Sequence, residues 1–379
     1  MTNFAFDYGP RVRSGVGAAA AIPELIAAER VLFVTDTGVR GLGLADAALA
    51  ALAEAGREVV VFDAVEADPS ADTVRAAVVA GAGCGAVVGF GGGSPMDVAK
   101  VAAYLLGSGD ELDAIYGVGM AKGQGLPLVL VPTTAGTGSE ATPISVITVG
   151  GAEKKGVNSP ALYAQWAILD AELTLGLPPH VTAATGVDAM VHAIEAYTSA
   201  RLKNPLSDAL AREALRLLAG NIRTAVRDGG NREARGAMLL GAYLAGVAFA
   251  NAPVAGVHAL AYPLGGHFHV PHGLSNALML PHVLGHNMTS ALDHYADLAP
   301  LVDPKLESLG RQGRAQGLVA ALQSIAADCG LPDRLRAVGV ESGHLDLLAS
   351  EAMKQQRLLV NNPCEITQAD ARRLYEAAL

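Results

Sequence analysis

The run GVDAMVHAIEAYTSA, residues 186–200, places charged side chains in an otherwise apolar segment with helical periodicity. Asp188 and His192 are four residues apart, and residues at that spacing lie on the same face of a helix; Glu195 follows in the same run. A buried charge is costly unless a partner compensates it. The pattern therefore favours two ligands of one metal ion, although a surface aspartate beside a core histidine would have the same spacing.

Further candidate ligands lie between residues 236 and 292, a segment with no Asp, Glu, Lys or Arg. It holds six of the ten histidines: His258, His267, His269, His272, His282 and His286. Imidazole is the commonest nitrogen ligand, and a segment without other charges suits the wall of a divalent metal site. One carboxylate and three imidazoles would form that site: Asp188, His192, His258 and His272. A divalent ion held there would polarise an alcohol or carbonyl oxygen. We expect His269 and His286 to fill the core instead.

The elements that must position these groups differ between the two halves of the chain. In the first half, short β-branched apolar runs alternate with Ala-rich helical segments; the runs cover residues 30–36, 57–65, 85–94 and 126–134. This alternation predicts βαβ units and a parallel sheet that is covered on both faces. From about Pro178 the periodicity is helical. The sequence predicts an α/β domain over residues 1–178 and an all-α domain over residues 179–379.

Two glycine-rich runs in the first half predict a phosphate site. GFGGGSPMDVAK, residues 89–100, follows an apolar strand and opens a helix with Asp97 in its first turn. Consecutive glycines let the backbone approach a ligand, and the amides of a helix N-terminus favour an anion such as pyrophosphate. A tight strand-to-helix turn would need the same glycines, and the signature GxGxxG is absent. VPTTAGTGSE, residues 131–140, adds a second strand end. Nucleotides bind at such ends of parallel strands, so we expect the glycine turn, together with Asp97, to bind a nucleotide cofactor.

Asp36 ends the apolar run RVLFVTD. An acidic residue at this strand end accepts the hydroxyls of the adenosine ribose and repels a 2′-phosphate, which favours NAD over NADP. A helix N-cap would explain the same aspartate equally well.

Composition narrows the class of partner. The formal net charge is −10 and there is no run of Lys or Arg, which argues against nucleic acid or an anionic membrane and favours small molecules. Three scattered cysteines and the lack of a signal-peptide pattern predict a cytoplasmic protein. The opening of the uncharged segment is as apolar as a membrane span, but it lacks flanking aromatic and basic anchors. We therefore expect buried core helices there.

Five motifs occur in a fixed order: GGGSPMDVAK, PTTAGTGSE, GVDAMVHAIEAYTS, HALAYPLGG and PHGLSNALMLPHVLGHN. In this order and at these separations they closely resemble the iron-containing (group III) alcohol dehydrogenases, over the whole length of the chain. The resemblance implies a dehydroquinate synthase-like fold, with an α/β dinucleotide-binding domain, an all-helical domain and a catalytic cleft between them. It also implies NAD, a metal that is usually ferrous iron and sometimes zinc, and a homo-oligomer, a dimer or larger.

The resemblance assigns roles to individual residues. The metal ligands of the family correspond to Asp188, His192, His258 and His272. The pyrophosphate loop of the family corresponds to Gly91, Gly92, Gly93 and Ser94, and other cofactor contacts correspond to Thr133, Thr134 and Thr137. The ribose-side contact corresponds to Lys155, and the residue that selects NAD corresponds to Asp36.

The chain departs from the family at Tyr262. Many members have a second histidine there, in the motif HxMAHPLG, with a role in the active site and in proton transfer. A tyrosine hydroxyl is a poor base at neutral pH, so the proton relay is expected to include Tyr262 or His267. The metal set is unaffected, because His258 and His272 keep their spacing.

The sequence thus predicts an NAD-dependent and metal-dependent alcohol dehydrogenase that interconverts a small alcohol and its aldehyde or ketone by hydride transfer. One alternative is a hydroxyacid-oxoacid transhydrogenase, in which the nicotinamide stays bound. A metal-dependent lyase with this fold is another, although its metal set normally begins with a glutamate. A non-catalytic metal or nucleotide binder is the last. Maleylacetate reductases depart from the metal-binding set, whereas this chain retains all four ligands.

Overall fold

The computed structural model describes residues 3–150 and 153–379. The chain folds into two compact units. One is Tyr8–Leu175, and the other is Gly176–Leu379 together with the described residues that precede Tyr8. The preceding segment belongs with the second unit because Asp7 N donates to Oδ1 of Asn251, and Nδ2 of Asn251 donates to the carbonyl oxygen of Asp7. We call Tyr8–Leu175 the α/β unit and the other the helical unit.

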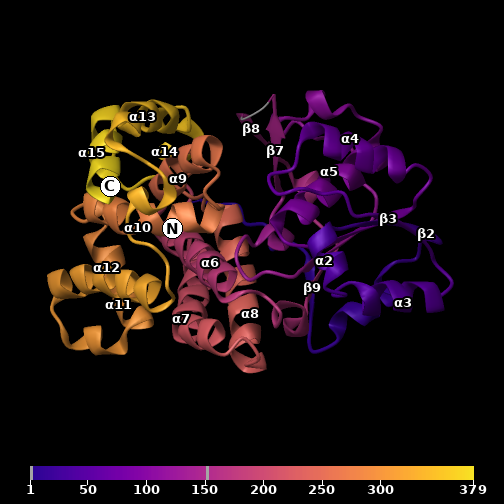
Figure 1. The fold of residues 1–379 in the computed structure, drawn as a ribbon, viewed down its shortest axis with the longest axis horizontal. Helices are drawn as coiled ribbons and strands as arrows, with labels where there is room; N and C mark the ends of the chain where they lie inside the picture. Colours follow the sequence, from indigo (N-terminus) through magenta and orange to yellow (C-terminus); the bar gives the residue numbers. More distant parts are fainter. Residues whose placement is uncertain (1–2, 151–152) are drawn as a thin grey trace. The chain divides into compact units, whose positions relative to one another are not determined.

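The α/β unit is built on a six-stranded parallel sheet (Figure 1). Its strands, in spatial order, are β1 (Arg11–Ser14), β9 (Trp166–Leu169), β6 (Leu128–Pro132), β4 (Ala86–Gly91), β2 (Arg30–Val34) and β3 (Glu58–Phe62). Every residue of β4 and β6 is buried, as expected for strands covered on both faces. The four strands predicted from apolar runs are all present, whereas β1 and β9 were not predicted.

Helices cover both faces of this sheet. Side chains alternate along each strand, so Val31 and Phe33 of β2 join one apolar cluster, and Leu32 and Val34 join the other. The first cluster includes side chains of the N-terminal helices, and the second includes those of α4 and α5. The α-helices of the unit are α1 (Ile22–Leu25), α2 (Thr37–Gly41), α3 (Asp46–Glu54), α4 (Ala71–Ala80) and α5 (Gly93–Ser108).

A second, three-stranded sheet was not predicted. It contains β5 (Gly117–Val118), β8 (Glu153–Asn158) and β7 (Ile144–Val149), with β7 and β8 antiparallel and β5 and β8 parallel. The sequence of β8, EKKGVN, gives no apolar signal, because most of its residues are only partly buried or exposed.

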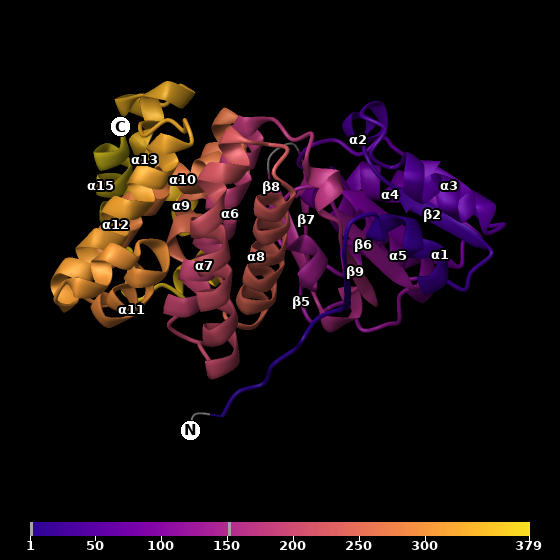
Figure 2. The ribbon, with the colours of Figure 1, turned by 90° about the horizontal axis from the view of Figure 1, so that it is seen from below.

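Residues 176–379 are all described and contain helices but no strand. The α-helices are α6 (Pro179–Thr198), α7 (Pro205–Arg227), α8 (Arg232–Asn251), α9 (Gly256–Phe268), α10 (His272–Asn287), α11 (Leu292–Val302), α12 (Arg311–Asp328), α13 (Leu345–Met353), α14 (Gln356–Leu359) and α15 (Gln368–Ala378). In Figure 2, α6, α7 and α8 run side by side, and each packs against the other two. This unit agrees with the predicted all-helical fold.

Helix α6 lies at the centre of the helical unit and carries two of the candidate ligands. Every residue from Gly186 to Thr198 is buried, which explains why apolar residues occur on every face of this part of the helix. Besides α7 and α8, helix α10 packs against it. Polar groups on α6 must therefore find partners inside the unit.

The apolar segment that begins after Arg235 forms parts of α8, α9 and α10. Within the described residues, no single helix is both long and apolar enough to cross a membrane. Helices α8 and α9 meet that criterion only as a pair, and the pair is bent by 106°. Much of each helix is buried within the unit, as the sequence predicted.

Candidate functional site

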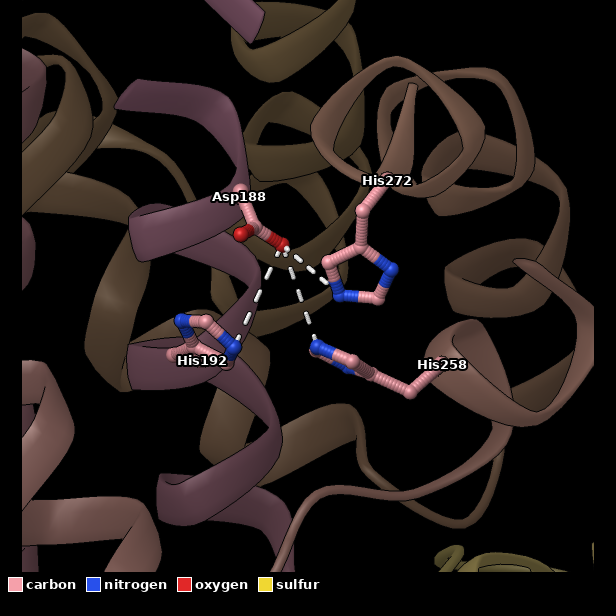
Figure 3. A group of neighbouring side chains, drawn as sticks. All are labelled: Asp188, His192, His258 and His272. Atoms are coloured by element: carbon pink, nitrogen blue, oxygen red, sulfur yellow. Dashed lines mark ion pairs between the residues drawn. The ribbon is translucent and has the colours of Figure 1, made fainter. Parts of the chain in front are cut away.

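The four candidate metal ligands come from three helices of the helical unit. Asp188 and His192 lie one turn apart on α6, His258 is in the first turn of α9, and His272 is the first residue of α10. Figure 3 shows the four side chains turned toward one another. One possible ligand atom from each lies within 4.8 Å of all the others. The fold thus brings together residues from distant parts of the sequence.

All three imidazoles present Nε2 to the same carboxylate oxygen. The distances from Oδ1 of Asp188 to the three Nε2 atoms are 4.0, 3.8 and 3.7 Å, for His192, His258 and His272 in that order. These distances are too long for hydrogen bonds and suit atoms that each lie about 2 Å from one ion. Only the side chain of His272 is accessible, at 38% exposed. A small molecule would therefore reach the group from the side of His272.

The ligand set fits a divalent transition metal ion. Imidazole nitrogens and a carboxylate oxygen are ligands that both zinc and ferrous iron accept. Asn276 is the one amide donor beside them. Its Nδ2 donates to Oδ1 of Asp188 at 2.6 Å and lies 3.2 and 3.3 Å from Nε2 of His258 and His272. Its Oδ1 is buried and has no hydrogen-bond partner among the described residues. A buried cluster so rich in acceptors lacks positive charge, which a bound cation would supply.

Asp188 is buried, and the side chains around it determine the pKa of its carboxyl group. Burial alone raises the pKa of a carboxyl group, but the three imidazoles and the Asn276 amide favour the ionised form. The net result is that the pKa of Asp188 lies below its ordinary value. The carboxylate is therefore available as an anionic ligand.

The close approach of α10 to α6 depends on Gly273. A Cβ atom at this position would overlap the carbonyl carbon and oxygen of Ala184 on α6 and would lie 3.3 Å from Cβ of Asp188. Since His272 immediately precedes Gly273, the missing side chain allows this ligand to reach Asp188.

Two residues beside the ligands were not given a role from the sequence. Glu195 on α6 accepts a hydrogen bond from Nδ1 of His258 at 2.7 Å, and Asn276 on α10 contacts three of the ligands. A signal for each was present, because Glu195 is a charge in a buried run and Asn276 lies four residues after His272. The partner of each could be identified only from the fold.

The residues expected to serve in proton transfer lie at different places on α9. The ring of Tyr262 is 5.8 Å from that of His272, centroid to centroid, and the guanidinium of Arg357 is 6.0 Å from the Tyr262 ring. His267, in the last turn of α9, is exposed and makes no hydrogen bond, ion pair or ring contact with the four candidate ligands. Of these two residues, only Tyr262 lies beside the ligand set.

The other histidines of the segment are not ligands of this cluster. His269 was expected in the core but is exposed, because it ends α9 with a left-handed backbone, φ 54°. His286 was also expected in the core but is only partly buried, and its Nε2 makes a hydrogen bond to the carbonyl oxygen of Glu365.

The predicted phosphate turn lies at the carboxyl ends of two neighbouring strands. Gly91 of β4 is paired with Pro132 of β6, and Thr133 N donates to the carbonyl oxygen of Gly91 at 2.9 Å. Gly91 has a φ of 148°, which side chains disfavour, and a Cβ there would lie 2.8 Å from Cγ of Pro95. The glycines and the threonines are therefore adjacent. The turn comprises Gly91, Gly92, Gly93 and Ser94, and the facing segment holds Thr133, Thr134 and Thr137.

Within the turn, Gly92 and Gly93 also lie close to the facing segment. A Cβ on Gly93 would lie 2.9 Å from Cγ2 of Thr137, and one on Gly92 would lie 3.7 Å from Cγ2 of Thr134. Gly92 is the N-cap of α5, a helix of 16 residues, and it provides no side-chain cap. The first amides of α5 therefore remain available to an anion.

Asp97 was expected in the first turn of α5, but it is the fifth residue of that helix and lies beyond the first turn, where it contacts the segment behind the glycine turn. One of its carboxylate oxygens accepts a hydrogen bond from Oγ of Ser139 at 2.6 Å, and the other accepts one from Val146 N at 2.8 Å. Nζ of the fully buried Lys100 lies 3.4 Å from the same carboxylate. Burial lowers the pKa of Lys100, and Asp97 opposes that effect. The protein contacts of Asp97 thus hold α5 against the segment after β6.

Asp36 and Lys155 lie in different parts of the α/β unit. Oδ1 of Asp36 accepts a hydrogen bond from Val39 N at 2.8 Å, which makes Asp36 the N-cap of α2, the alternative left open from the sequence. Its Oδ2 lies 3.4 Å from where a Cβ on Gly91 would be, beside the glycine turn. Lys155 is on β8, and its side-chain contacts are with Glu153 and the ring of Tyr116.

Comparison with known proteins covers almost the whole chain. Residues 9–171 match the family described as iron-containing alcohol dehydrogenase, and residues 182–379 match the C-terminal part of the Fe-containing alcohol dehydrogenase family. Long-chain-alcohol dehydrogenase 1 of Geobacillus thermodenitrificans is 42% identical over 365 residues, which is 94% of this chain and 92% of that protein.

Solved structures agree in fold. The crystal structure of a 1,3-propanediol oxidoreductase superposes with a TM-score of 0.95 at 36% identity and covers 99% of this chain and 100% of its own. Sulfoacetaldehyde reductase from Bifidobacterium kashiwanohense, solved in complex with NAD+, has a TM-score of 0.88 at 28% identity, with coverage of 100% and 99%. With both family descriptions matched in sequence and the fold matched in space, the chain belongs to the iron-containing alcohol dehydrogenase family.

Proposed function

We propose that this protein is an NAD-dependent and metal-dependent alcohol dehydrogenase, which interconverts a small alcohol and its aldehyde or ketone by hydride transfer. The observation that carries the proposal is the convergence of Asp188, His192, His258 and His272 in a chain of this family. The relatives named above are an alcohol dehydrogenase, a diol oxidoreductase and an aldehyde reductase, all of which act on an alcohol or its carbonyl partner.

The metal would be held by three imidazole nitrogens and one carboxylate oxygen. A divalent cation in such a site polarises the oxygen of an alcohol or carbonyl compound. The chain's own groups orient the substrate: His272 is the accessible ligand, and the ring of Tyr262 lies next to it. Three other ligands are buried and exclude water from the far side. We propose ferrous iron as the resident metal, with zinc as the alternative that the same ligands accept.

The cofactor would bind the α/β unit. We propose that the free amides at the start of α5 receive the pyrophosphate of NAD, with Gly91, Gly92, Gly93, Ser94 and Asp97 in or behind the turn. Thr133, Thr134 and Thr137 would contact the cofactor from the facing segment, and Lys155 from the ribose side. Asp36 would bind the adenosine ribose through Oδ2 while Oδ1 keeps capping α2. The NAD+ complex of the sulfoacetaldehyde reductase supports this choice of cofactor.

The proton of the alcohol would leave through Tyr262 or His267. Tyr262 has the stronger structural support, because its ring lies 5.8 Å from that of the ligand His272. A hydroxyl at this place passes a proton on by donating and accepting hydrogen bonds, without holding a charge itself.

We also propose a cytoplasmic homo-oligomer. Cys84, Cys329 and Cys364 are all free thiols, which persist in a reducing compartment. The oligomer rests on the family resemblance alone.

The test is turnover of NAD by purified protein that has been stripped with a chelator, with ferrous iron or zinc added back. Substrates would include short and long primary alcohols, 1,3-propanediol and the matching aldehydes, and NADH absorbance would report the reaction. We expect metal-restored turnover that His192→Ala abolishes. His180→Ala is the matched control, because His180 is an exposed residue on the same helix, and it should keep full activity.

Two results would contradict the proposal. Turnover of NAD by metal-free protein would show that the four candidate ligands do not hold a metal that the reaction needs. Hydride transfer that occurs only when an oxoacid acceptor is added, with no release of NADH, would replace the dehydrogenase by a transhydrogenase.

A further inference from the structure

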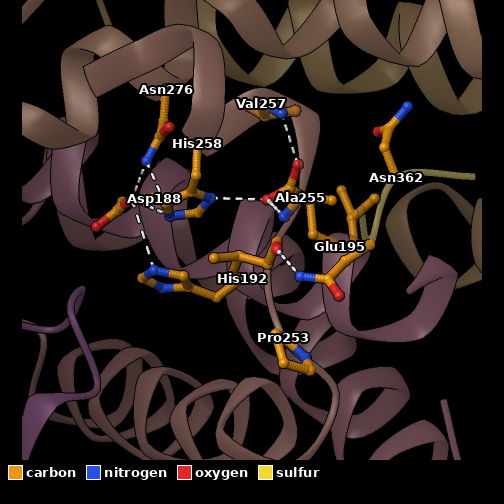
Figure 4. Close-up of polar contacts among 12 residues, drawn as sticks. Asp188, His192, Glu195, Pro253, Ala255, Val257, His258, Asn276 and Asn362 are labelled. Carbon is orange, nitrogen blue, oxygen red and sulfur yellow. Dashed lines mark hydrogen bonds and ion pairs between the residues drawn. The ribbon is translucent and has the colours of Figure 1, made fainter. Parts of the chain in front are cut away.

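Glu195 is a buried carboxylate that the proposed chemistry does not use. It lies on α6, three residues after His192, and is 3% exposed. Its two oxygens accept three hydrogen bonds: from Ala255 N at 2.8 Å, from Val257 N at 2.6 Å and from Nδ1 of His258 at 2.7 Å. Figure 4 shows this carboxylate between the start of α9 and the ring of His258. All three donors belong to one short stretch of chain.

The bond to His258 determines which ring nitrogen can bind a metal. An ionised carboxylate only accepts hydrogen bonds, so Nδ1 must carry the proton, and Nε2 keeps a free lone pair. Nε2 is the atom that faces Oδ1 of Asp188, at 3.8 Å. Glu195 therefore fixes both the tautomer and the direction of this ligand.

The bonds to the backbone determine where α9 begins. Ala255 is the N-cap of α9 and has no side chain that can accept from the first turn. Glu195 takes over this role from a neighbouring helix, since it accepts from two of the amides that a helix N-terminus leaves unpaired and places a negative charge there. The same carboxylate thus joins α6, which carries two ligands, to α9, which carries the third.

The turn that Glu195 joins has little freedom to move. Oγ of Ser199 donates to the carbonyl oxygen of Pro253 at 2.9 Å, and Nδ2 of Asn361 donates to that of Val254 at 3.1 Å. A Cβ on Gly256 would lie 2.6 Å from Oδ1 of Asn362. Because this turn is held in place, the hydrogen bonds of Glu195 fix His258 at a defined position relative to α6.

We infer that Glu195 is a positioning residue of the metal centre: it holds His258 in the tautomer that binds metal through Nε2, and it fixes α9 on α6. The inference rests on the proposed metal site. Glu195 would thus act through His258 and the start of α9, to which its hydrogen bonds are made, and not by touching metal or substrate.

The first experiment measures metal affinity directly, by competition with a coloured chelator, for the wild type and for Glu195→Gln. Glutamine has one acceptor oxygen and places an NH2 group against donors, so at least one of the three bonds is lost. We expect the dissociation constant for zinc and cobalt to rise by about 10- to 100-fold. The visible spectrum of bound cobalt should also change, because His258 is no longer held in one orientation.

Asp170→Asn is the matched control. Asp170 is also a buried carboxylate, 2% exposed, that accepts backbone N–H groups, from Gly17, Ala19 and Glu172, and it contacts no candidate ligand. Asp170 lies in the α/β unit, so a loss of stability of the chain as a whole that weakened metal binding would appear in both variants. We expect Asp170→Asn to keep the wild-type affinity and cobalt spectrum.

A second measurement does not depend on whether the variant folds. Nitrogen-15 NMR of histidine-labelled wild-type protein, with His258 assigned by substitution, should show the proton on Nδ1 of His258 both before and after zinc is added. A proton on Nε2 in the metal-free protein would overturn the inference, and so would a folded Glu195→Gln protein with unchanged affinity and spectrum. A wild type that binds no divalent metal would instead reject the proposed metal site.

Discussion

Asp36 combines two tasks in one side chain, which makes its role in cofactor choice testable. One oxygen caps α2, and the other lies beside the glycine turn. Loss of the cap alone would cost about 1 kcal/mol of stability. A substitution that retains the cap but removes the charge can therefore separate structure from cofactor selection.

Asp36→Ser makes this separation, because serine is also a good N-cap. We expect the melting temperature to stay near that of the wild type, while the ratio of kcat/KM for NADP to that for NAD rises by at least about 10-fold. The reason is that the carboxylate no longer repels a 2′-phosphate. Steady-state kinetics with both cofactors would measure the ratio. An unchanged ratio in a stably folded variant would leave Asp36 with the capping role only.

Among single residues, the grouping of the four candidate ligands was the part of the candidate site that the sequence could predict best. Asp188 and His192 share a helix, so their spacing alone places them together. The chemical type and spacing of His258 and His272 identified them as candidates. Glu195 was visible as a charge in a buried run, but its three donors all come from residues 255–258, and no local pattern joins that turn to α6.

At the scale of elements, the contact between α6 and α10 depends on Gly273, where any side chain would overlap the backbone of α6. We expect Gly273→Ala to displace the start of α10 and with it His272. Metal affinity should fall by at least about 10-fold, and the free energy of unfolding by about 2 kcal/mol. The measurements are chelator competition and denaturant unfolding.

Gly285→Ala is the control for this prediction, since a Cβ at Gly285, on the same helix, meets nothing within 4 Å. That variant should be neutral or up to about 1 kcal/mol more stable, because alanine favours helix more than glycine does. Equal effects of the two substitutions would show that the contact with Ala184 does not set the position of His272.

The central strands of the large sheet were predicted, and the edge strand β1 and the strands of the small sheet were missed. β3 was also predicted although it is only partly buried, whereas β9 was missed although three of its four residues are buried. β2, β4 and β6 are continuous apolar runs, because helices cover both faces of the sheet. β1, with the sequence RVRS, lies at the sheet edge and is mostly exposed, and β8 is charged, so neither carries an apolar signal. The predicted strand over residues 85–94 was too long, because Gly93 already begins α5.

At the scale of the whole molecule, the two kinds of candidate ligand-binding residue lie in different units. All four candidate metal ligands belong to the helical unit, and the glycine turn belongs to the α/β unit. Bound metal should therefore stabilise the helical unit first, and bound NAD the α/β unit. Each should add about 2.7 kcal/mol to the free energy of unfolding at a concentration 100 times its dissociation constant.

Hydrogen exchange followed by mass spectrometry would show this division. Zinc should slow exchange in α6, α9 and the start of α10, and NAD should slow it between β4 and α5. Magnesium, which prefers oxygen ligands, is the control ion and should have little effect on the three helices. Protection by zinc that is confined to the α/β unit would be incompatible with the proposed site.

The pairing of Asp7 with Asn251 has a consequence for how the chain is made. These two residues are 244 positions apart and exchange two hydrogen bonds. Asp7 and the α/β unit that follows it leave the ribosome before α8 does, and domains generally fold as they emerge. Asp7 can pair with Asn251 only after α8 has been synthesised. The segment that contains Asp7 therefore reaches its native place only after the whole α/β unit has been synthesised, and a nascent chain halted before α8 would leave this segment open to proteases.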